Sequence, residues 1–175
     1  RRTRELLKEL IAWRERVKPK MGFFTEASVN LADEAELCEL MVKAGFKKVF
    51  LGIETPSVEG LEECGKQQNR MRDLGDSVRI LQRAGLEVMG GFIVGFDSDP
   101  QDIFRRQFEF IQQSGVVTAM VGLLTALPET ALYRRLAREG CEVLTSGRDA
   151  VDLRRQKEVE DWLAQARPDA VFLAA

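Results

Sequence analysis

Histidine is absent from the 175 residues of this sequence. It is the commonest general base near neutral pH and the commonest metal ligand, so its absence removes most metal sites and most acid–base mechanisms. The three cysteines, Cys38, Cys64 and Cys141, lie too far apart in sequence to form a local metal-binding motif. We therefore expect no metal site in this chain, only small buried or half-buried thiols kept reduced in a cytoplasmic compartment.

Long apolar runs and an excess of positive charge are missing as well. No apolar run approaches the roughly 18–20 residues that a membrane span requires. The formal net charge is -2, which argues against a surface that binds nucleic acid. What is present is the composition of a globular domain, with 45% hydrophobic and 31% charged residues. We expect neither a membrane nor a nucleic acid as a partner.

Residues 85–100 form the most informative stretch of the sequence. Gly85 is typical of the left-handed position just past a helix, which glycine adopts without steric cost. The apolar run over residues 88–94 suits a strand that is covered on both faces, as in parallel sheets. We therefore expect Phe92 and Ile93 to be buried on opposite faces of a sheet.

An acidic loop follows this strand at residues 95–100. In α/β proteins ligands bind where parallel strands end, which favours a binding role for the loop. Asp99 and Pro100 are also typical of the N-cap and the first position of the next helix. Both interpretations can hold together, and they stay open at this point.

Helices and strands alternate along the chain, and most predicted helices end at a glycine just before an apolar strand. The closing glycines are Gly45, Gly85, Gly115 and Gly140. Predicted strands cover residues 23–28, 48–54, 88–94 and 116–124. Predicted helices cover residues 1–20, 33–44, 73–84, 102–113, 130–138 and 158–166. The fourth of these helices is expected to bury Ile103, Phe104, Phe108 and Ile111. The alternation predicts an α/β fold with a mostly parallel sheet, either part of a (β/α) barrel or a small open sheet.

Five short motifs occur in the order and spacing found in radical S-adenosylmethionine enzymes. They are residues 25–28 (TEAS), 52–56 (GIETP), 66–69 (KQQN), 90–97 (GGFIVGFD) and 127–133 (LPETALY). The chain most resembles the group whose full-length members carry a cobalamin-binding domain before the barrel. The resemblance covers residues 1–140 and implies strands three to six of a six-stranded partial barrel. In that family the strand ends hold S-adenosylmethionine against a [4Fe-4S] cluster.

The resemblance also implies particular cofactor-binding residues. Glu26 and Glu54 would face the ribose and the methionine end of S-adenosylmethionine, and Lys66 would pair with its carboxylate through a charge-assisted contact. The backbone of Val94, Gly95, Leu124 and Ala126 would lie along the adenine. The acidic loop residue Asp97 completes the implied set. Asp97 is expected to lie exposed beside Glu54 and Glu26 at an acidic cleft. The alternatives are that Glu54 merely caps the next helix and that Lys66 is merely solvated.

The sequence also departs from that family. The C-x3-C-x2-C motif that binds the cluster is missing, and so is the next strand with its glycine-rich turn. An iron–sulfur cluster needs thiolates held together, so we assign no catalytic residue and expect a part of such an enzyme that is inactive alone. The chain begins at Arg1 rather than Met and ends in an apolar run at residues 171–175, and we expect it to be a piece of a longer protein.

Residues 136–175 resemble a different family, GDP-L-fucose synthase, an NADP-dependent epimerase/reductase with a dinucleotide-binding fold. This second resemblance implies that Arg148 contacts the 2′-phosphate of NADP. The glycine-rich turn for the pyrophosphate and the catalytic Ser/Tyr/Lys set are absent, and a plain βαβ ending is the alternative. We expect a partial barrel at 1–140 and a Rossmann-like βαβ piece at 141–175, joined as in a chimeric sequence.

Three functional interpretations follow from these observations. The first is a fragment that contributes to S-adenosylmethionine binding in a radical enzyme. The second is a module that binds a nucleotide such as NADP, and the third is an α/β scaffold without a ligand. The partner would be a small-molecule cofactor, and exposed sheet edges would allow self-association.

Overall fold

The computed structural model describes residues 2–140 and 155–167. The chain forms two compact units, Arg1–Gly122 and Leu123–Ala175. Arg148, Cys141 and the apolar run at residues 171–175 lie outside the described residues. The predicted division of the chain at residue 140 stays a prediction.

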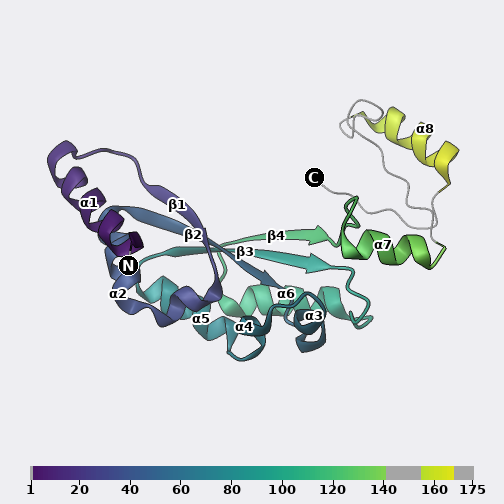
Figure 1. The fold of residues 1–175 in the computed structure, drawn as a ribbon, viewed down its shortest axis with the longest axis horizontal. Coiled ribbons are helices and arrows are strands. Elements are labelled where there is room, and N and C mark those ends of the chain that lie inside the picture. The colour runs from purple at the N-terminus through teal and green to yellow at the C-terminus, as the bar shows by residue number, and fades with distance from the viewer. Residues whose placement is uncertain (1, 141–154, 168–175) are drawn as a thin grey trace. The chain divides into compact units, whose positions relative to one another are not determined.

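The first unit is an α/β layer built on a parallel sheet. Its strands are β1 (Phe23–Ala27), β2 (Phe46–Glu54), β3 (Glu87–Val94) and β4 (Thr118–Leu123). They are ordered β1-β2-β3-β4, and the pairs β1–β2 and β2–β3 are parallel. Figure 1 shows β4 running beside β3 in the same direction. The predicted α/β class with a parallel sheet is therefore confirmed.

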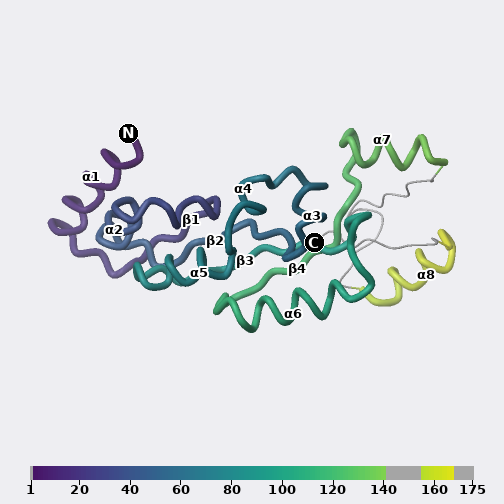
Figure 2. The backbone as a smooth tube through the Cα atoms, turned by 90° about the horizontal axis from the view of Figure 1, so that it is seen from below, coloured from purple at the N-terminus to yellow at the C-terminus, as the bar shows by residue number. Residues whose placement is uncertain are grey.

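The helical segments of this unit connect successive strands, except for the first, which precedes β1. They are α1 (Arg2–Val17), a 3-10 turn η1 (Val29–Asp33), α2 (Ala35–Ala44), α3 (Val58–Glu63), α4 (Gln67–Arg70), α5 (Leu74–Arg83) and α6 (Ile103–Ser114). Figure 1 shows α2, α5 and α6 on one side of the sheet, and Figure 2 gives the view from that side. Parallel strands need such crossovers, because a tight hairpin cannot join them.

Several helix boundaries follow directly from local sequence. Gly45 and Gly115 close α2 and α6 in the left-handed conformation, with φ of 94° and 81°. The carboxylate of Asp73 caps α5 by accepting a hydrogen bond from the backbone N–H of Asp76 at 2.9 Å. Asp33, in contrast, does not cap α2, since it ends the 3-10 turn and its carboxylate pairs with Arg72.

The structure also corrects the predicted cap of α6. This helix begins at Ile103, and the side chain of Asp99 does not cap it. Oδ2 of Asp99 instead accepts hydrogen bonds from the backbone N–H groups of Gly95, at 2.7 Å, and Phe96, at 3.0 Å. The aspartate therefore shapes the loop that leaves β3 rather than the start of the next helix.

The core lies between the sheet and its helices. Burial alternates along β3, where Val88, Phe92 and Val94 are at most 3% exposed. Ile93 is only half-buried, so the prediction that both faces of this strand are covered is wrong for Ile93. The reason is that the described helices of this unit cover one face. The opposite face, which they leave uncovered and which is here called the open face, carries Phe50, Met89 and Ile93.

The helix α6 shows the same kind of difference. Ile103 is buried as predicted, whereas Phe104 is 68% exposed and Phe108 is 63% exposed. The side chain that packs inward is Phe110, whose ring meets that of Phe92 edge-on at 6.0 Å between centroids. The burial predicted for Phe104 and Phe108 is therefore wrong.

The second unit contains two described helices, α7 (Ala131–Arg138) and α8 (Gln156–Ala166). Thr130 caps α7, where its hydroxyl accepts a hydrogen bond from the backbone N–H of Tyr133 at 3.3 Å. Both helices were predicted from sequence. Across the part of the chain that the structure describes, none of the helices combines the length and apolarity needed to cross a membrane.

Candidate functional site

The carboxyl end of β2 has an unusual backbone geometry. Glu54, the last residue of this strand, has φ of 69°, in the left-handed region that residues other than glycine rarely adopt. Its carboxylate Oε1 lies 2.7 Å from Nζ of Lys66, and the side chains are 14% and 36% exposed respectively. Two predicted site residues are thus brought into direct contact.

The pairing of β2 with β3 explains why the backbone turns there. Gly52 pairs with Gly91 and Glu54 pairs with Phe92, so β2 carries one extra residue, Ile53, at this point. An extra residue of this kind locally breaks the hydrogen-bond ladder and redirects the following side chain. The bulge therefore frees backbone carbonyl groups of β2 and turns Glu54 toward Lys66.

Asn69 holds this bulge in place. Its side chain is 1% exposed, and its Nδ2 donates hydrogen bonds to the carbonyl oxygens of Gly52 and Ile53, each at 3.1 Å. Only the amide nitrogen can donate to two carbonyls, which sets the orientation of the side chain. Its Oδ1 is buried without a hydrogen-bond partner. The buried amide is thus a structural support directly behind Glu54.

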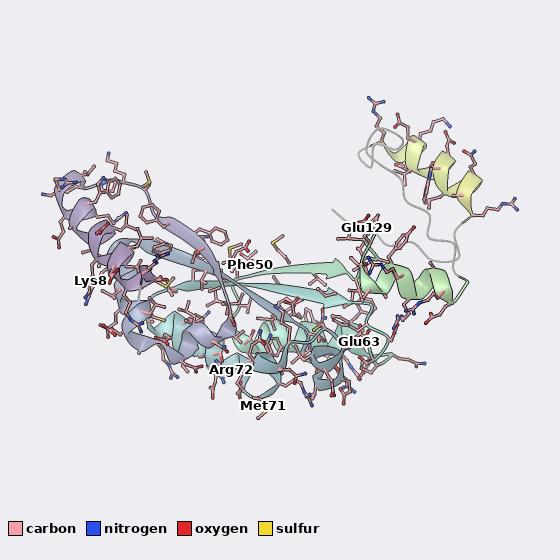
Figure 3. All side chains as sticks on the ribbon, in the orientation of Figure 1. Lys8, Phe50, Glu63, Met71, Arg72 and Glu129 are labelled. Carbon is pink, nitrogen blue, oxygen red and sulfur yellow. The ribbon has the colours of Figure 1, made fainter. Side chains whose placement is uncertain are left out.

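Two glycines leave room on the open face beside this pair. A Cβ at Gly52 would come within 2.6 Å of Oε1 of Glu54 and within 3.2 Å of Nζ of Lys66. A Cβ at Gly91 would come within 2.6 Å of the ring of Phe50. Figure 3 shows Phe50 on the side of the sheet opposite Arg72. A side chain at either position would displace these neighbours on the open face.

The other predicted residues of the first unit lie at different levels of the sheet. Glu26 is exposed on β1 and is level with Phe50, four residues before Glu54, or about 13 Å along a strand. Val94 ends β3 and is buried, while Gly95 and Asp97 are exposed in the loop that follows. The structure therefore brings Glu54 and Lys66 together and places Glu26 further down the sheet.

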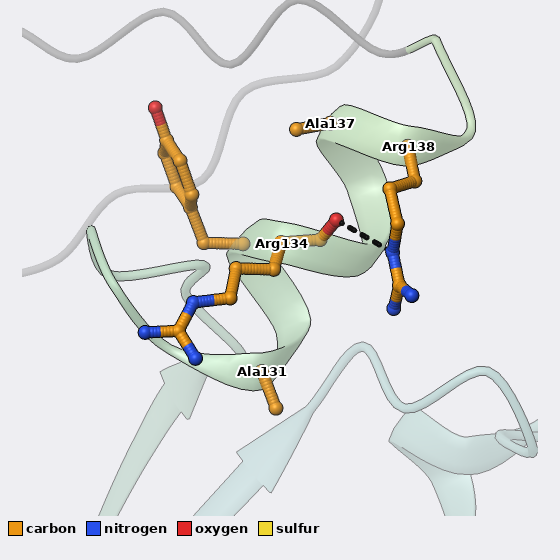
Figure 4. A pocket seen from close by; sticks show the side chains of 5 residues that line it. Ala131, Arg134, Ala137 and Arg138 are labelled. Carbon is orange, nitrogen blue, oxygen red and sulfur yellow. Dashed lines mark hydrogen bonds between the residues drawn. The ribbon is translucent and has the colours of Figure 1, made fainter.

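Leu124 and Ala126 belong to the second unit, where both are half-buried. A hollow on the surface of α7 is lined by Ala131, Tyr133, Arg134, Ala137 and Arg138 (Figure 4). In it, Nε of Arg138 donates a hydrogen bond to the carbonyl oxygen of Arg134 at 3.2 Å. None of the predicted site residues that the structure describes lines this hollow, and we assign it no function.

The cysteines of the described residues do not fit a [4Fe-4S] cluster. Cys38 is 1% exposed, and its Sγ donates to the carbonyl oxygen of Leu31 at 3.4 Å. Burial raises the pKa of the Cys38 thiol and, likewise, that of the Cys64 thiol. A raised pKa disfavours the thiolate, which is the form that binds metal. Within residues 2–140 and 155–167, no group of three His, Cys, Asp or Glu side chains could hold a metal ion.

Sequence reasoning assigned no role to Asn69, although it ends the motif at residues 66–69. A buried Asn that supports a bulge has no local pattern, because its partners, Gly52 and Ile53, lie 17 and 16 residues away. The signal that could have found it is its place in that motif, three residues after Lys66.

Curated proteins of similar sequence include methyltransferases. No protein-family model matches the chain. It is 48% identical over 139 residues to an uncharacterised methyltransferase of Synechocystis sp., covering 79% of this chain and 26% of that protein. It is 36% identical over 146 residues to the hopanoid C-2 methylase of Rhodopseudomonas palustris, covering 83% of this chain and 28% of that protein. The chain thus spans about a quarter of the length of these curated relatives.

The resemblance of the C-terminal part is much shorter. A GDP-L-fucose synthase of Sinorhizobium fredii is 48% identical over 46 residues, which is 26% of this chain and 15% of that enzyme. Such a match establishes similarity of one segment and carries no activity to the chain.

The fold is similar to that of a solved methyltransferase. The radical S-adenosylmethionine methyltransferase TsrM from Kitasatospora setae, solved with cobalamin and a [4Fe-4S] cluster, matches with a TM-score of 0.66 at 18% identity. The match covers 82% of this chain and 29% of TsrM. At this identity the likeness establishes the fold. The chain is therefore similar in sequence to methyltransferases and similar in fold to cobalamin-dependent radical S-adenosylmethionine enzymes.

Proposed function

We propose that this chain is the S-adenosylmethionine-binding part of a radical S-adenosylmethionine methyltransferase and is inactive by itself. The observation that carries the proposal is the Glu54–Lys66 pair at the carboxyl end of β2. Ligands of α/β proteins bind at that end of the strands. The strained backbone of Glu54 supports the proposal, because such conformations cluster at functional sites. Methyltransferases among the relatives point to the same cofactor.

The chemistry of the pair suits this ligand. A carboxylate only accepts hydrogen bonds, so Glu54 would bind the ribose hydroxyls. The ammonium of Lys66 has three donors, and its contact with Glu54 leaves others for the ligand's carboxylate. The pair is neutral overall, which fits the zwitterionic amino-acid end of S-adenosylmethionine. When bound, this cofactor supplies the methyl group, and the chain's residues bind and orient it.

The remaining contacts belong to the proposal as well. The backbone of Val94 and Gly95 would lie along the adenine, and Glu26 and Asp97 would lie near the ligand. The same adenine contact for Leu124 and Ala126, which belong to the second unit, stays a prediction. The described residues do not fit an iron–sulfur cluster. NADP binding at Arg148 and self-association through exposed sheet edges stay predictions, and analytical ultracentrifugation would test the second.

Titration of the isotope-labelled chain with S-adenosylhomocysteine, followed by NMR, tests the proposal. We expect weak binding, with Kd near or above 1 mM, or about -4 kcal/mol. Shifted resonances should cluster around Glu54, Lys66 and Gly95. Absence of any shift at millimolar ligand, or equal shifts with NADP, would contradict the proposed site.

A matched control exists on the same strand. Lys48 and Glu87 form another Lys–Glu pair at 2.7 Å, near the opposite end of β2. Lys66→Ala should weaken binding by about 1–3 kcal/mol, as for a charged hydrogen bond. Lys48→Ala removes the same kind of pair away from the site and should leave binding unchanged.

A further inference from the structure

The loop that leaves β3 has all four of its first backbone N–H groups bound to carboxylates. Oδ2 of Asp99 accepts from Gly95 and Phe96, as described above. The carboxylate of Glu63 accepts from the two residues that follow. Its Oε1 lies 3.1 Å from the backbone N of Asp97, and its Oε2 lies 3.0 Å from the backbone N of Ser98. Oγ of Ser98 also donates to Oε2 of Glu63 at 2.7 Å.

The two carboxylates differ in where they come from. Asp99 belongs to the loop itself, so its bonds shape the loop locally. Glu63 ends α3 and lies 34 residues before Asp97 in the sequence. Figure 3 shows Glu63 on α3, near the ends of the strands. The three bonds of Glu63 therefore join two connections of the sheet, one that follows β2 and one that follows β3.

The connection that follows β2 also carries Lys66. The backbone N–H of Lys66 donates to the carbonyl oxygen of Leu61 in α3 at 2.9 Å, so the position of Lys66 depends on that of α3. Glu63 lies at the end of α3 and its carboxylate binds the β3 loop. It thus sets the position of this loop relative to Lys66. Bonds to an ionised acceptor are stronger than neutral ones, and here one side chain accepts three of them.

We propose that Glu63 is a positioning residue of the cofactor site. It fixes the backbone of the β3 loop, which would face the adenine of the ligand, relative to Lys66, which would face the ligand's carboxylate. Glu63 itself contacts no ligand. As far as the ligand is concerned, this inference rests on the proposed function. Preorganised loops bind more tightly because less ordering is required on binding.

Amide hydrogen exchange measured by NMR tests the contact directly. In Glu63→Ala, the amides of Asp97 and Ser98 should exchange about tenfold faster or more than in the wild type, because both lose their acceptor. The amide of Gly95, bound to Asp99, serves as an internal reference and should change less. Glu63→Gln keeps an acceptor oxygen and should restore part of the protection.

The control variant is Glu62→Ala. Glu62 is the neighbouring residue on α3, its side chain is 63% exposed, and it pairs with Arg70 at 3.3 Å. Its removal should leave exchange in the β3 loop unchanged. The protection of Leu51 in the core reports in every variant that the protein is folded.

Titration with two ligands tests positioning as opposed to a merely structural contact. Glu63→Ala should weaken adenosine and S-adenosylhomocysteine by a similar factor, about tenfold, since the loop faces the nucleoside. Lys66→Ala should weaken S-adenosylhomocysteine and leave adenosine unchanged, since adenosine has no carboxylate. Glu63→Gln should recover part of the lost affinity.

Three outcomes would overturn the inference. Unchanged exchange at Asp97 and Ser98 in Glu63→Ala would show that the contact does not order the loop. Faster exchange with unchanged affinity for both ligands would show a contact without a positioning role. A wild-type chain that binds neither ligand would overturn the proposed function, and the positioning role with it.

Discussion

Nζ of Lys66 lies 2.7 Å from Oε1 of Glu54, and the backbone of Glu54 is in the left-handed region. The comparable pair Lys48–Glu87 is more exposed, with side-chain exposures of 48% and 34% against 36% and 14%. The more protected pair therefore occupies the strand end where a ligand would bind. Three supports surround it, namely the bulge in β2, the buried amide of Asn69 and the space left at Gly52.

Two replacements of Glu54 should differ in their effect on the free energy of unfolding, while both abolish ligand binding. Glycine adopts positive φ without cost, so Glu54→Gly should change the free energy of unfolding by no more than about 1 kcal/mol. Glu54→Val puts a β-branched side chain in a conformation it avoids and should cost about 1–3 kcal/mol. Urea unfolding measures both values. Equal stability of the two variants would mean that the backbone relaxes out of this conformation. Both should lose binding of S-adenosylhomocysteine.

Loss of the Asn69 amide should destabilise the bulge. Asn69→Ala leaves the carbonyl groups of Gly52 and Ile53 without this donor, at a cost of about 1–3 kcal/mol in the free energy of unfolding. Gln67→Ala, at an exposed position on the same short helix, should change it by no more than about 0.5 kcal/mol. Chemical denaturation of both variants decides the matter, and a tolerated Asn69→Ala would argue against the supporting role.

Three apolar positions provide a test of which face is covered. Phe92 is 2% exposed, and Phe92→Ala should cost about 3–5 kcal/mol. Phe108 is 63% exposed, so Phe108→Ala should cost at most about 0.5 kcal/mol. Ile93→Ala, on the open face, should fall between them at about 1–2 kcal/mol. Melting temperatures that rank these variants in another order would show that the burial pattern of β3 is wrong.

The thiols of Cys38, which is buried, and of Cys64, which is half-buried, should react slowly at neutral pH. The pKa of Cys38 and that of Cys64 are raised by burial, so the folded protein holds these protons more tightly than the unfolded chain does. Their contribution to stability is therefore complete below the pKa of an unfolded thiol and is lost as the pH rises through the folded-state pKa. Alkylation by iodoacetamide, followed by mass spectrometry, should be slow at pH 7 for both residues and accelerate in alkali. Rapid labelling of Cys38 in the native protein at pH 7 would contradict its burial.

Local patterns in the sequence determined most of the element boundaries. A glycine that ends a helix, such as Gly45 or Gly115, acts through its own backbone conformation, and Asp73 caps α5 through residues one turn away. These effects need no distant partner, so they can be predicted from the local sequence. The parallel α/β arrangement follows in the same way from the alternation of helices and strands.

Tertiary structure decided everything that depends on a distant partner. Ile93 lies in an apolar run typical of a strand that is covered on both faces. The described helices of the first unit cover one face of this sheet, so Phe92 is buried and Ile93 is half-buried. The contact of Glu63 with Asp97 joins residues 34 apart. Such contacts form only when separate strands end at the same edge of a sheet. A local pattern of residues therefore cannot predict them.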